Sequence, residues 1–119
     1  MPNQIYIGSC HCGGIRYQFE GPEIVSAMKC TCSICDRKGA LLTDFTVPKN
    51  NITIEAAAGQ LRDYKFNTGV ATHHFCDTCG IFTFVETRLN PGEYRFNLGC
   101  LEGVDMHALP VEVFDGDSI

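Results

Sequence analysis

Eight cysteines are the residues whose type and spacing best suit chemistry in this sequence of 119 residues. Seven lie in three tight clusters and one stands alone: Cys10 and Cys12; Cys30, Cys32 and Cys35; Cys76 and Cys79; and Cys100. Two thiolates that are one or two residues apart can converge on one ion at about 2.3 Å. A disulfide between cysteines separated by a single residue would instead strain a small ring. The spacing therefore favours zinc over disulfide formation.

The two outer clusters are each followed directly by glycine, Gly13 and Gly80. A chain that turns its amides toward the sulfurs often needs a positive φ at this position. A structural zinc takes four protein ligands, so two distant pairs would complete one site and join the N-terminal part to residues near 80. We assign this site to Cys10, Cys12, Cys76 and Cys79. The alternatives are free buried thiols or a redox-active pair at Cys76 and Cys79.

The central cluster gathers three cysteines, Cys30, Cys32 and Cys35, within six residues. Three thiolates can hold zinc and leave the fourth coordination position for water or a substrate. The alternatives are a closed four-cysteine site completed by Cys100 and a cluster without metal. Cys100 has apolar neighbours, which favours a small core residue, and we leave it out of the site.

Charged and imidazole side chains flank the clusters, and each also has an ordinary structural interpretation. Asp36 could accept a proton or bind a substrate amine, but an aspartate in a first helical turn commonly complements the helix dipole. Arg37 and Lys38 could bind substrate carboxylates or serve as helix-end charges. The His11 ring is expected to point away from the metal, because alternate residues point apart. One residue of the pair His73-His74 could reach the edge of a site, but the ordinary interpretation is a strand residue with a solvated or hydrogen-bonded imidazole.

Period-two alternation predicts a fold made mainly of strands. Apolar and polar residues alternate at 15–19 and 94–98, and more weakly at 52–54, 64–66, 82–84 and 111–113. Turn residues separate these segments at 48–51, 59, 67–69 and 90–92. One short helix is expected over 33–38, with Ser33 as its N-cap and Gly39 as its stop. The sequence therefore predicts an all-β domain with small sheets.

Length, charge and hydropathy restrict the function classes. A chain of 119 residues fits one domain, and no linker or repeat divides it, so we take 1–119 as the functional unit, with a polar tail at 115–119. The net charge of −5 argues against nucleic-acid binding, and short apolar runs argue against a membrane span. The N-terminus lacks the pattern of a secretory signal, which predicts a reducing compartment, the cytoplasm.

The three clusters with their flanking residues resemble the glutathione-dependent formaldehyde-activating enzyme family, which includes the centromere protein V group. The resemblance covers nearly the whole chain and is carried by residues 8–14, 30–37, 75–80 and 95–101. It implies a β-tent fold, with one structural zinc on the outer cysteines and a second zinc on Cys30, Cys32 and Cys35. It also implies the addition of glutathione to formaldehyde to give S-hydroxymethylglutathione, or the reverse lyase step.

A mechanism follows from the donor set of the central cluster. An exogenous thiol that becomes the fourth ligand would be held as thiolate at neutral pH, where free thiols with a pKa of ~8.5 are mostly protonated. The thiolate would attack a small aldehyde and form an oxyanion, for which the sequence names no certain proton donor. Three thiolates and one dication carry a net charge of −1, which favours activation of sulfur over activation of water.

Two other classes of function remain open from the sequence. In one, both zincs are structural and the domain binds a thiol or a protein without catalysis. In the other, the chain is similar to methionine sulfoxide reductases, with Cys100 as the catalytic thiol. The cysteine triplet and the apolar surroundings of Cys100 argue against the second class.

Overall fold

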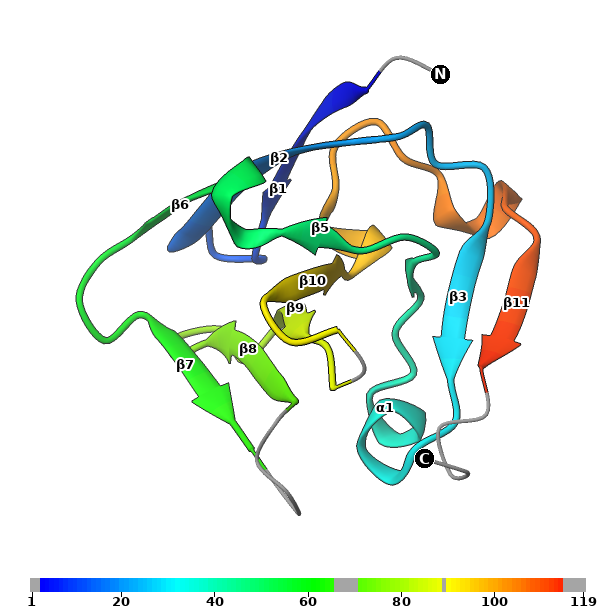
Figure 1. Cartoon of the computed structure of the whole chain (residues 1–119). Coiled ribbons are helices and arrows are strands. Elements are labelled where there is room, and N and C mark those ends of the chain that lie inside the picture. The colour runs from blue at the N-terminus through cyan, green and yellow to red at the C-terminus, as the bar shows by residue number, and fades with distance from the viewer. Residues whose placement is uncertain (1–2, 66–70, 89, 115–119) are drawn as a thin grey trace.

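Three small β-sheets and one short α-helix form the fold in the computed structural model, which describes residues 3–65, 71–88 and 90–114 (Figure 1). The predicted strand-rich fold is confirmed. The expectations at Phe66, at 67–69 and at 115–119 fall outside the described residues. The strands are β1 (Gln4–Ser9), β2 (Ile15–Gly21), β3 (Ala27–Cys30), β4 (Leu42–Thr43), β5 (Val47–Pro48), β6 (Ile52–Ala56), β7 (Leu61–Tyr64), β8 (Thr72–Cys76), β9 (Phe82–Glu86), β10 (Glu93–Phe96) and β11 (Val111–Phe114).

The first sheet, in the order β1-β2-β6, contains the clearest alternation of the chain. Ile15, Tyr17 and Phe19 are buried on one face of β2, while the residues between them are exposed. Strand β2 is antiparallel to both of its neighbours. The alternation predicted at 15–19 is therefore confirmed, and its apolar face points into the core.

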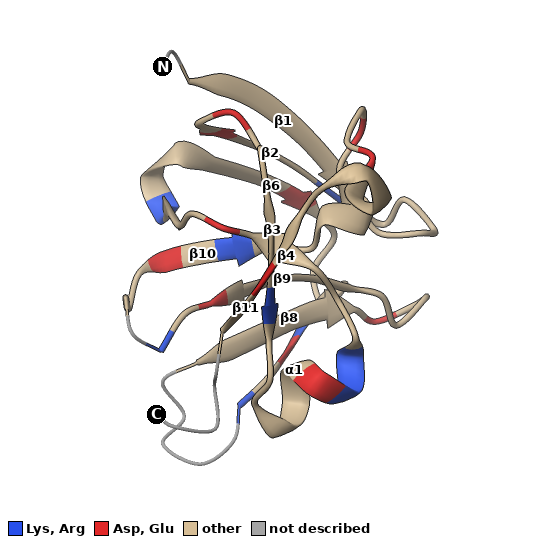
Figure 2. Ribbon diagram, turned by 90° about the vertical axis from the view of Figure 1, so that its right-hand side faces the viewer, with Lys and Arg blue, Asp and Glu red and all other residues tan. Residues whose placement is uncertain are grey.

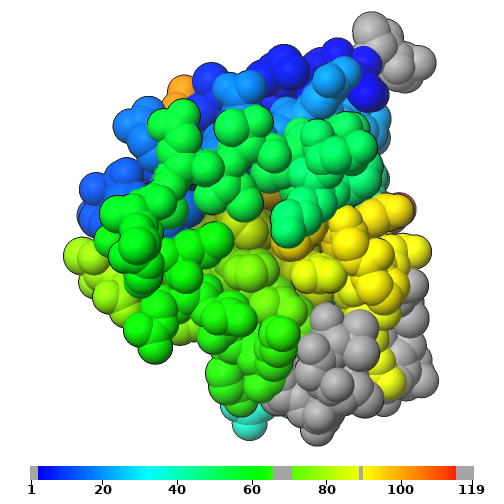
Figure 3. All heavy atoms as spheres, turned by 60° about the vertical axis from the view of Figure 1, so that its left-hand side comes forward, coloured from blue at the N-terminus to red at the C-terminus, as the bar shows by residue number. Residues whose placement is uncertain are grey.

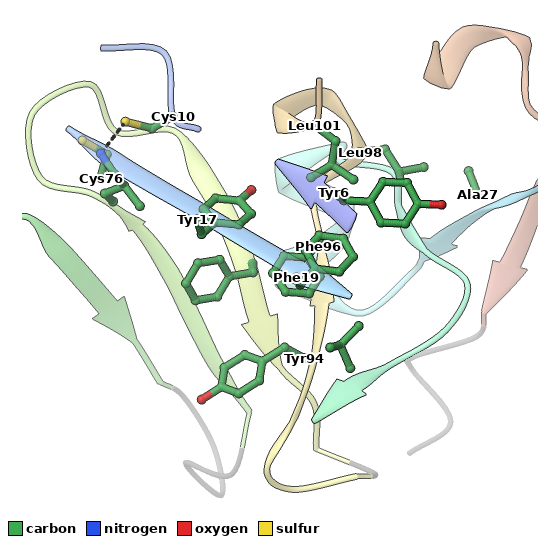
Figure 4. Packing of buried hydrophobic residues seen from close by; sticks show 13 residues of the cluster. Tyr6, Cys10, Tyr17, Phe19, Ala27, Cys76, Tyr94, Phe96, Leu98 and Leu101 are labelled. Atoms are coloured by element: carbon green, nitrogen blue, oxygen red, sulfur yellow. Dashed lines mark hydrogen bonds between the residues drawn. The ribbon is translucent and has the colours of Figure 1, made fainter. Parts of the chain in front are cut away.

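The second sheet, in the order β5-β10-β9-β8-β7, contributes the opposite side of the core. The Phe19 ring of the first sheet stacks on Phe96 of β10, with 3.9 Å between ring centroids. Tyr17 meets the edge of Phe84 on β9 at 5.2 Å. Figure 4 shows this aromatic cluster with Cys10 and Cys76 at one end. Packing of the two sheets thus brings the two outer cysteine clusters together.

The strand expected over 94–98 is shorter than predicted. Strand β10 ends at Phe96, and Leu98 begins a 3₁₀ helix, η2 (Leu98–Cys100). The Asn97 side chain accepts a hydrogen bond from the Gly99 amide at 3.1 Å, which turns the chain away from the sheet. Leu98 remains buried, so its apolar character reflects core packing after the strand has ended.

The third sheet, in the order β11-β3-β4, contains a parallel pair, β11 with β3. The alternation at 111–113 does not mark a half-buried strand, because Val111 and Val113 are 47% and 66% exposed. Strand β11 lies at the sheet edge, where one side has no neighbouring strand among the described residues. Ile54 and Tyr64, on the edge strands β6 and β7, are likewise more exposed than the alternation predicts.

The helix α1 (Ser33–Lys38) has the predicted bounds but a different first cap. Cys32 is the N-cap, with φ −62° and ψ 161°, and it makes no side-chain capping bond. The expectation that Ser33 is the N-cap is therefore wrong, because Ser33 is already in the helix. Gly39 ends the helix as predicted, with φ 66° and its amide bonded to the Cys35 carbonyl. Figure 2 shows acidic and basic residues together on α1.

The connection from β6 to β7 passes from the first sheet to the second along one face of the molecule (green in Figure 3). It includes Gly59, whose φ of 80° allows the turn predicted there. Gln60 follows directly and lies beside the second outer cysteine cluster. No helix within the described part of the chain is long and apolar enough to cross a membrane.

Candidate functional site

The four outer cysteines lie together as the sequence predicts. Their sulfurs are all within 4.8 Å of one another, although two come from the β1–β2 turn and two from the β8–β9 turn. Cys12 Sγ is 3.7 Å from Cys10 Sγ and 3.6 Å from Cys76 Sγ. Four sulfurs placed tetrahedrally about a zinc at about 2.3 Å would be about 3.8 Å apart. The geometry of Cys10, Cys12, Cys76 and Cys79 thus fits a closed four-thiolate metal site.

Two similar turns build this site. In the first, the Ile15 amide donates to Cys10 Sγ at 3.3 Å, and Gly13 has a φ of 82°. In the second, the Gly80 amide donates to the Cys76 carbonyl at 2.9 Å, and Gly80 has a φ of 73°. The positive φ predicted after each outer cluster is confirmed. These backbone conformations favour glycine because a Cβ atom would strain them.

Gln60 adds a polar contact that no local sequence pattern predicts. Its Nε2 donates hydrogen bonds to Cys76 Sγ at 3.0 Å and to Thr78 Oγ1 at 2.9 Å. The backbone amide of Cys79 and, more weakly, the Gln60 side chain lower the pKa of Cys76 to about 6, although burial opposes them. Cys76 is therefore mainly a thiolate at neutral pH, which is the form that binds a metal.

The three central cysteines also converge, with sulfurs within 4.8 Å of one another. Cys30 ends β3, Cys32 caps α1, and Cys35 lies in the first turn of that helix. Within the described ranges, no fourth cysteine, histidine or carboxylate joins the group. The Cys30 thiol, together with burial, raises the pKa of Cys35 far above its usual range. A dication would remove this repulsion between thiolates, so the donor set is suited to a metal such as zinc.

Cys100 lies apart from both groups of converging sulfurs. Its Sγ donates to the Phe82 carbonyl at 3.6 Å, and burial raises its pKa to about 11. A thiol of this kind is protonated at neutral pH and a poor nucleophile. The position agrees with the expectation of a packed residue and gives no support to a four-cysteine central site.

Lys38 points from the helix onto the second sheet. Its Nζ lies 3.4 Å from the centroid of the Phe82 ring and 2.5 Å from His73 Nδ1. Burial lowers the pKa of Lys38 to about 8. The thiols of Cys35, Cys32 and Cys30 act in the opposite direction and raise it. Lys38 is therefore more than a solvated helix-end charge. Lys38 and Cys35 share one side of α1, because residues three apart on a helix are neighbours.

The other flanking residues occupy positions that fit structural roles. Arg37 Nη1 donates to the Ser33 carbonyl at 2.9 Å, and Asp36 is exposed on the first turn of α1. His11 is exposed and is not among the converging ligands. His74 packs against the Phe84 ring at 5.0 Å between centroids.

A cavity of about 620 Å³ opens beside Lys38. It lies between the C-terminal end of α1, the start of β9, η2 and a further 3₁₀ helix, η3 (Met106–Ala108). Its lining includes Lys38, Leu41, Ile81, Cys100 and Met106. This volume is within the range of roughly 300–1,000 Å³ that is usual for small-molecule sites.

Comparison with known proteins finds both a family model and a solved structure that match this chain. The model of a family described as glutathione-dependent formaldehyde-activating enzyme matches residues 5–116, a range that includes all eight cysteines. The crystal structure of a Rhodobacter sphaeroides protein is similar, with a TM-score of 0.79 and 36% sequence identity. The match covers 89% of this chain and 99% of that protein.

Proposed function

The chain belongs to the glutathione-dependent formaldehyde-activating enzyme family, and on this basis we propose that it is a zinc-dependent enzyme resembling a carbon–sulfur lyase. Its substrate would be the adduct of a small thiol, such as glutathione, with formaldehyde or a related small aldehyde. Residues 1–119 would act as one domain in a reducing compartment such as the cytoplasm.

The two cysteine groups would have different roles. Cys10, Cys12, Cys76 and Cys79 would hold a structural zinc, since four thiolates complete its coordination. Cys30, Cys32 and Cys35 would hold a second zinc, which when bound supplies a site that keeps a substrate thiol in its thiolate form. The observation that carries the proposal is the convergence of three central sulfurs with no fourth donor among the described residues.

The chain's own residues would position the reactants. Lys38 places a cationic group beside the central cysteines and at the cavity, where it can attract an anionic thiol or a polar carbonyl. In the synthetic direction the thiol sulfur bonds to the carbonyl carbon, and the carbonyl π electrons move to oxygen. The proton lost by the thiol returns to that oxygen, so a thiol and an aldehyde give one hydroxymethyl thioether. The lyase direction reverses these steps.

Two-dimensional exchange NMR at equilibrium tests this proposal, because it measures the rate of thiol–aldehyde interconversion even when the uncatalysed reaction is fast. The wild-type protein, purified without chelator, should contain two zincs per chain and accelerate exchange between glutathione, formaldehyde and their adduct. Cys35→Ser should lose one zinc and the acceleration but remain folded. Cys100→Ser is the matched control and should keep both properties. Full acceleration by Cys35→Ser would contradict the proposal.

A non-catalytic thiol-binding or protein-interaction module is the second candidate function, favoured by the convergence of the four outer sulfurs, which would hold a structural zinc that takes no part in chemistry. It predicts that glutathione binds to the zinc-loaded protein while exchange stays at its uncatalysed rate. The same NMR experiment therefore separates the two candidates.

A further inference from the structure

Lys38 has surroundings unlike those of a surface lysine. Its Nζ lies over the face of the Phe82 ring and within hydrogen-bond distance of His73 Nδ1, and the residue lines the cavity of about 620 Å³. Across the described residues, the one ion pair joins Arg62 to Asp77, so none of the described carboxylates pairs with Lys38. A lysine amine near apolar groups and without a carboxylate is more easily deprotonated than a solvated one.

His73 places a neutral imidazole nitrogen next to this amine. It lies on β8, is 4% exposed and faces Lys38 Nζ through Nδ1 at 2.5 Å. Burial, followed by the nearby Lys38 charge, lowers the pKa of His73 to about 4, so the ring is neutral at pH 7. In the tautomer protonated at Nε2, His73 Nδ1 accepts a hydrogen bond from Lys38 Nζ. A nucleophile within hydrogen-bond distance of a base is the arrangement found in covalent catalysis.

We infer that Lys38 is a covalent capture site for small aldehydes, which it binds reversibly through Nζ at the edge of the cavity. The inference rests on the proposed function for the identity of its ligand class, since the aldehyde is the second reactant there. Lys38 would hold the aldehyde one helical turn from Cys35, which is one of the three cysteines proposed to hold the second zinc.

The capture step balances without a further reactant. The Nζ lone pair bonds to the carbonyl carbon, and the carbonyl π electrons move to oxygen. One N–H proton passes through His73 Nδ1 to that oxygen and gives a carbinolamine. Loss of one water converts the carbinolamine to an imine, and addition of water reverses the sequence and releases the aldehyde. Reversal beside the central cysteines would raise the local aldehyde concentration.

Reductive trapping tests this inference without measuring catalysis. The zinc-loaded wild-type protein is treated briefly at pH 7 with formaldehyde and cyanoborohydride, which converts each imine to N-methyl-lysine. After digestion with a protease that does not cleave at lysine, mass spectrometry gives the rate at each lysine. Lys38 should be modified at least about tenfold faster than the exposed Lys49 and Lys65, because its amine packs on the Phe82 ring beside the neutral His73 ring, whereas the other two amines are solvated. An equal or slower rate at Lys38 would overturn the inference.

Two controls test whether the faster modification of Lys38 depends on the folded structure and on His73. In protein unfolded with guanidinium and chelator, the Lys38 to Lys49 rate ratio should fall to about one. In His73→Gln the rate at Lys38 should fall severalfold while that at Lys49 is unchanged, and an unchanged Lys38 rate would remove His73 from the capture step. If His73→Gln fails to fold, the wild-type ratio alone decides the inference. Trapping needs no thiol, so its failure is distinct from failure of the exchange assay.

Discussion

Cys12 Sγ lies 3.6 Å from Cys76 Sγ, although 64 residues separate the two cysteines. The contact joins the β1–β2 turn of the first sheet to the end of β8 in the second sheet. Cys10 and Cys76 are also part of the buried core, so the same side chains belong to the proposed metal site and to the packing between sheets. Metal binding and core formation should therefore be coupled.

Replacement of Cys79 by alanine tests this coupling. Binding of a structural zinc contributes about 10–16 kcal/mol in small zinc domains, so loss of one of four ligands should destabilise the whole fold. We expect Cys79→Ala to lose one zinc and to melt at a much lower temperature. Cys100→Ser, outside both metal groups, should keep its zinc content and most of its stability. Unchanged melting and zinc content in Cys79→Ala would show that the ligand pairing is wrong.

The Gln60 side chain should tune the affinity of the same site. Gln60→Ala removes the donor to Cys76 Sγ, and loss of such an outer contact typically weakens metal binding by about 10–100-fold. Competition with a chromophoric zinc chelator measures this change. Arg62→Ala is the control, because it removes an exposed ion pair to Asp77, which lies on the same turn as Cys76. Loss of this ion pair should lower the free energy of unfolding by less than about 1 kcal/mol. Equal zinc affinity in the two variants would exclude a role for Gln60.

Local sequence patterns predicted the parts of the fold that depend on residues close together in the chain. Strand β2 followed from its alternation, and the helix ended at Gly39 because that position needs a left-handed conformation. The convergence of the sulfurs in both cysteine groups could be predicted from cysteine spacing, since neighbouring members of each group lie within one turn. The family resemblance was confirmed by the match over residues 5–116.

Features that depend on distant contacts were not predictable. Lys38 meets His73 across 35 residues, and nothing in either local sequence indicates the contact. Val113 has the alternation of a half-buried strand, but burial depends on a covering layer, and β11 is an edge strand. The N-cap prediction was wrong by one residue because Cys32 still has an extended conformation and Ser33 is the first helical residue, although serine is the better capping residue.

The stacked pair of Phe19 and Phe96 should dominate core stability. Phe96 is fully buried, and its ring also packs near those of Tyr17 and Phe84. Phe96→Ala should lower the free energy of unfolding by about 3–5 kcal/mol, because it removes these contacts and leaves a cavity. Val113→Ala, at an exposed position, should change it by less than about 0.5 kcal/mol. Urea unfolding of both variants with saturating zinc measures the difference, and equal effects would contradict the assigned core.

Buried His73 should make stability depend on pH in mildly acidic solution. Burial lowers its pKa from 6.5 to about 4, so between these values the unfolded chain binds more protons than the folded chain. The His73 contribution is therefore complete above about pH 6.5 and is lost as the pH falls toward 4. The free energy of unfolding of wild type should fall more steeply over this range than that of His73→Gln. His107→Gln, which alters an exposed histidine, should follow the wild-type curve. Acid also protonates the proposed zinc ligands in every variant, so the quantity to measure is the difference between the wild-type and His73→Gln curves. Parallel curves for these two proteins would contradict the prediction.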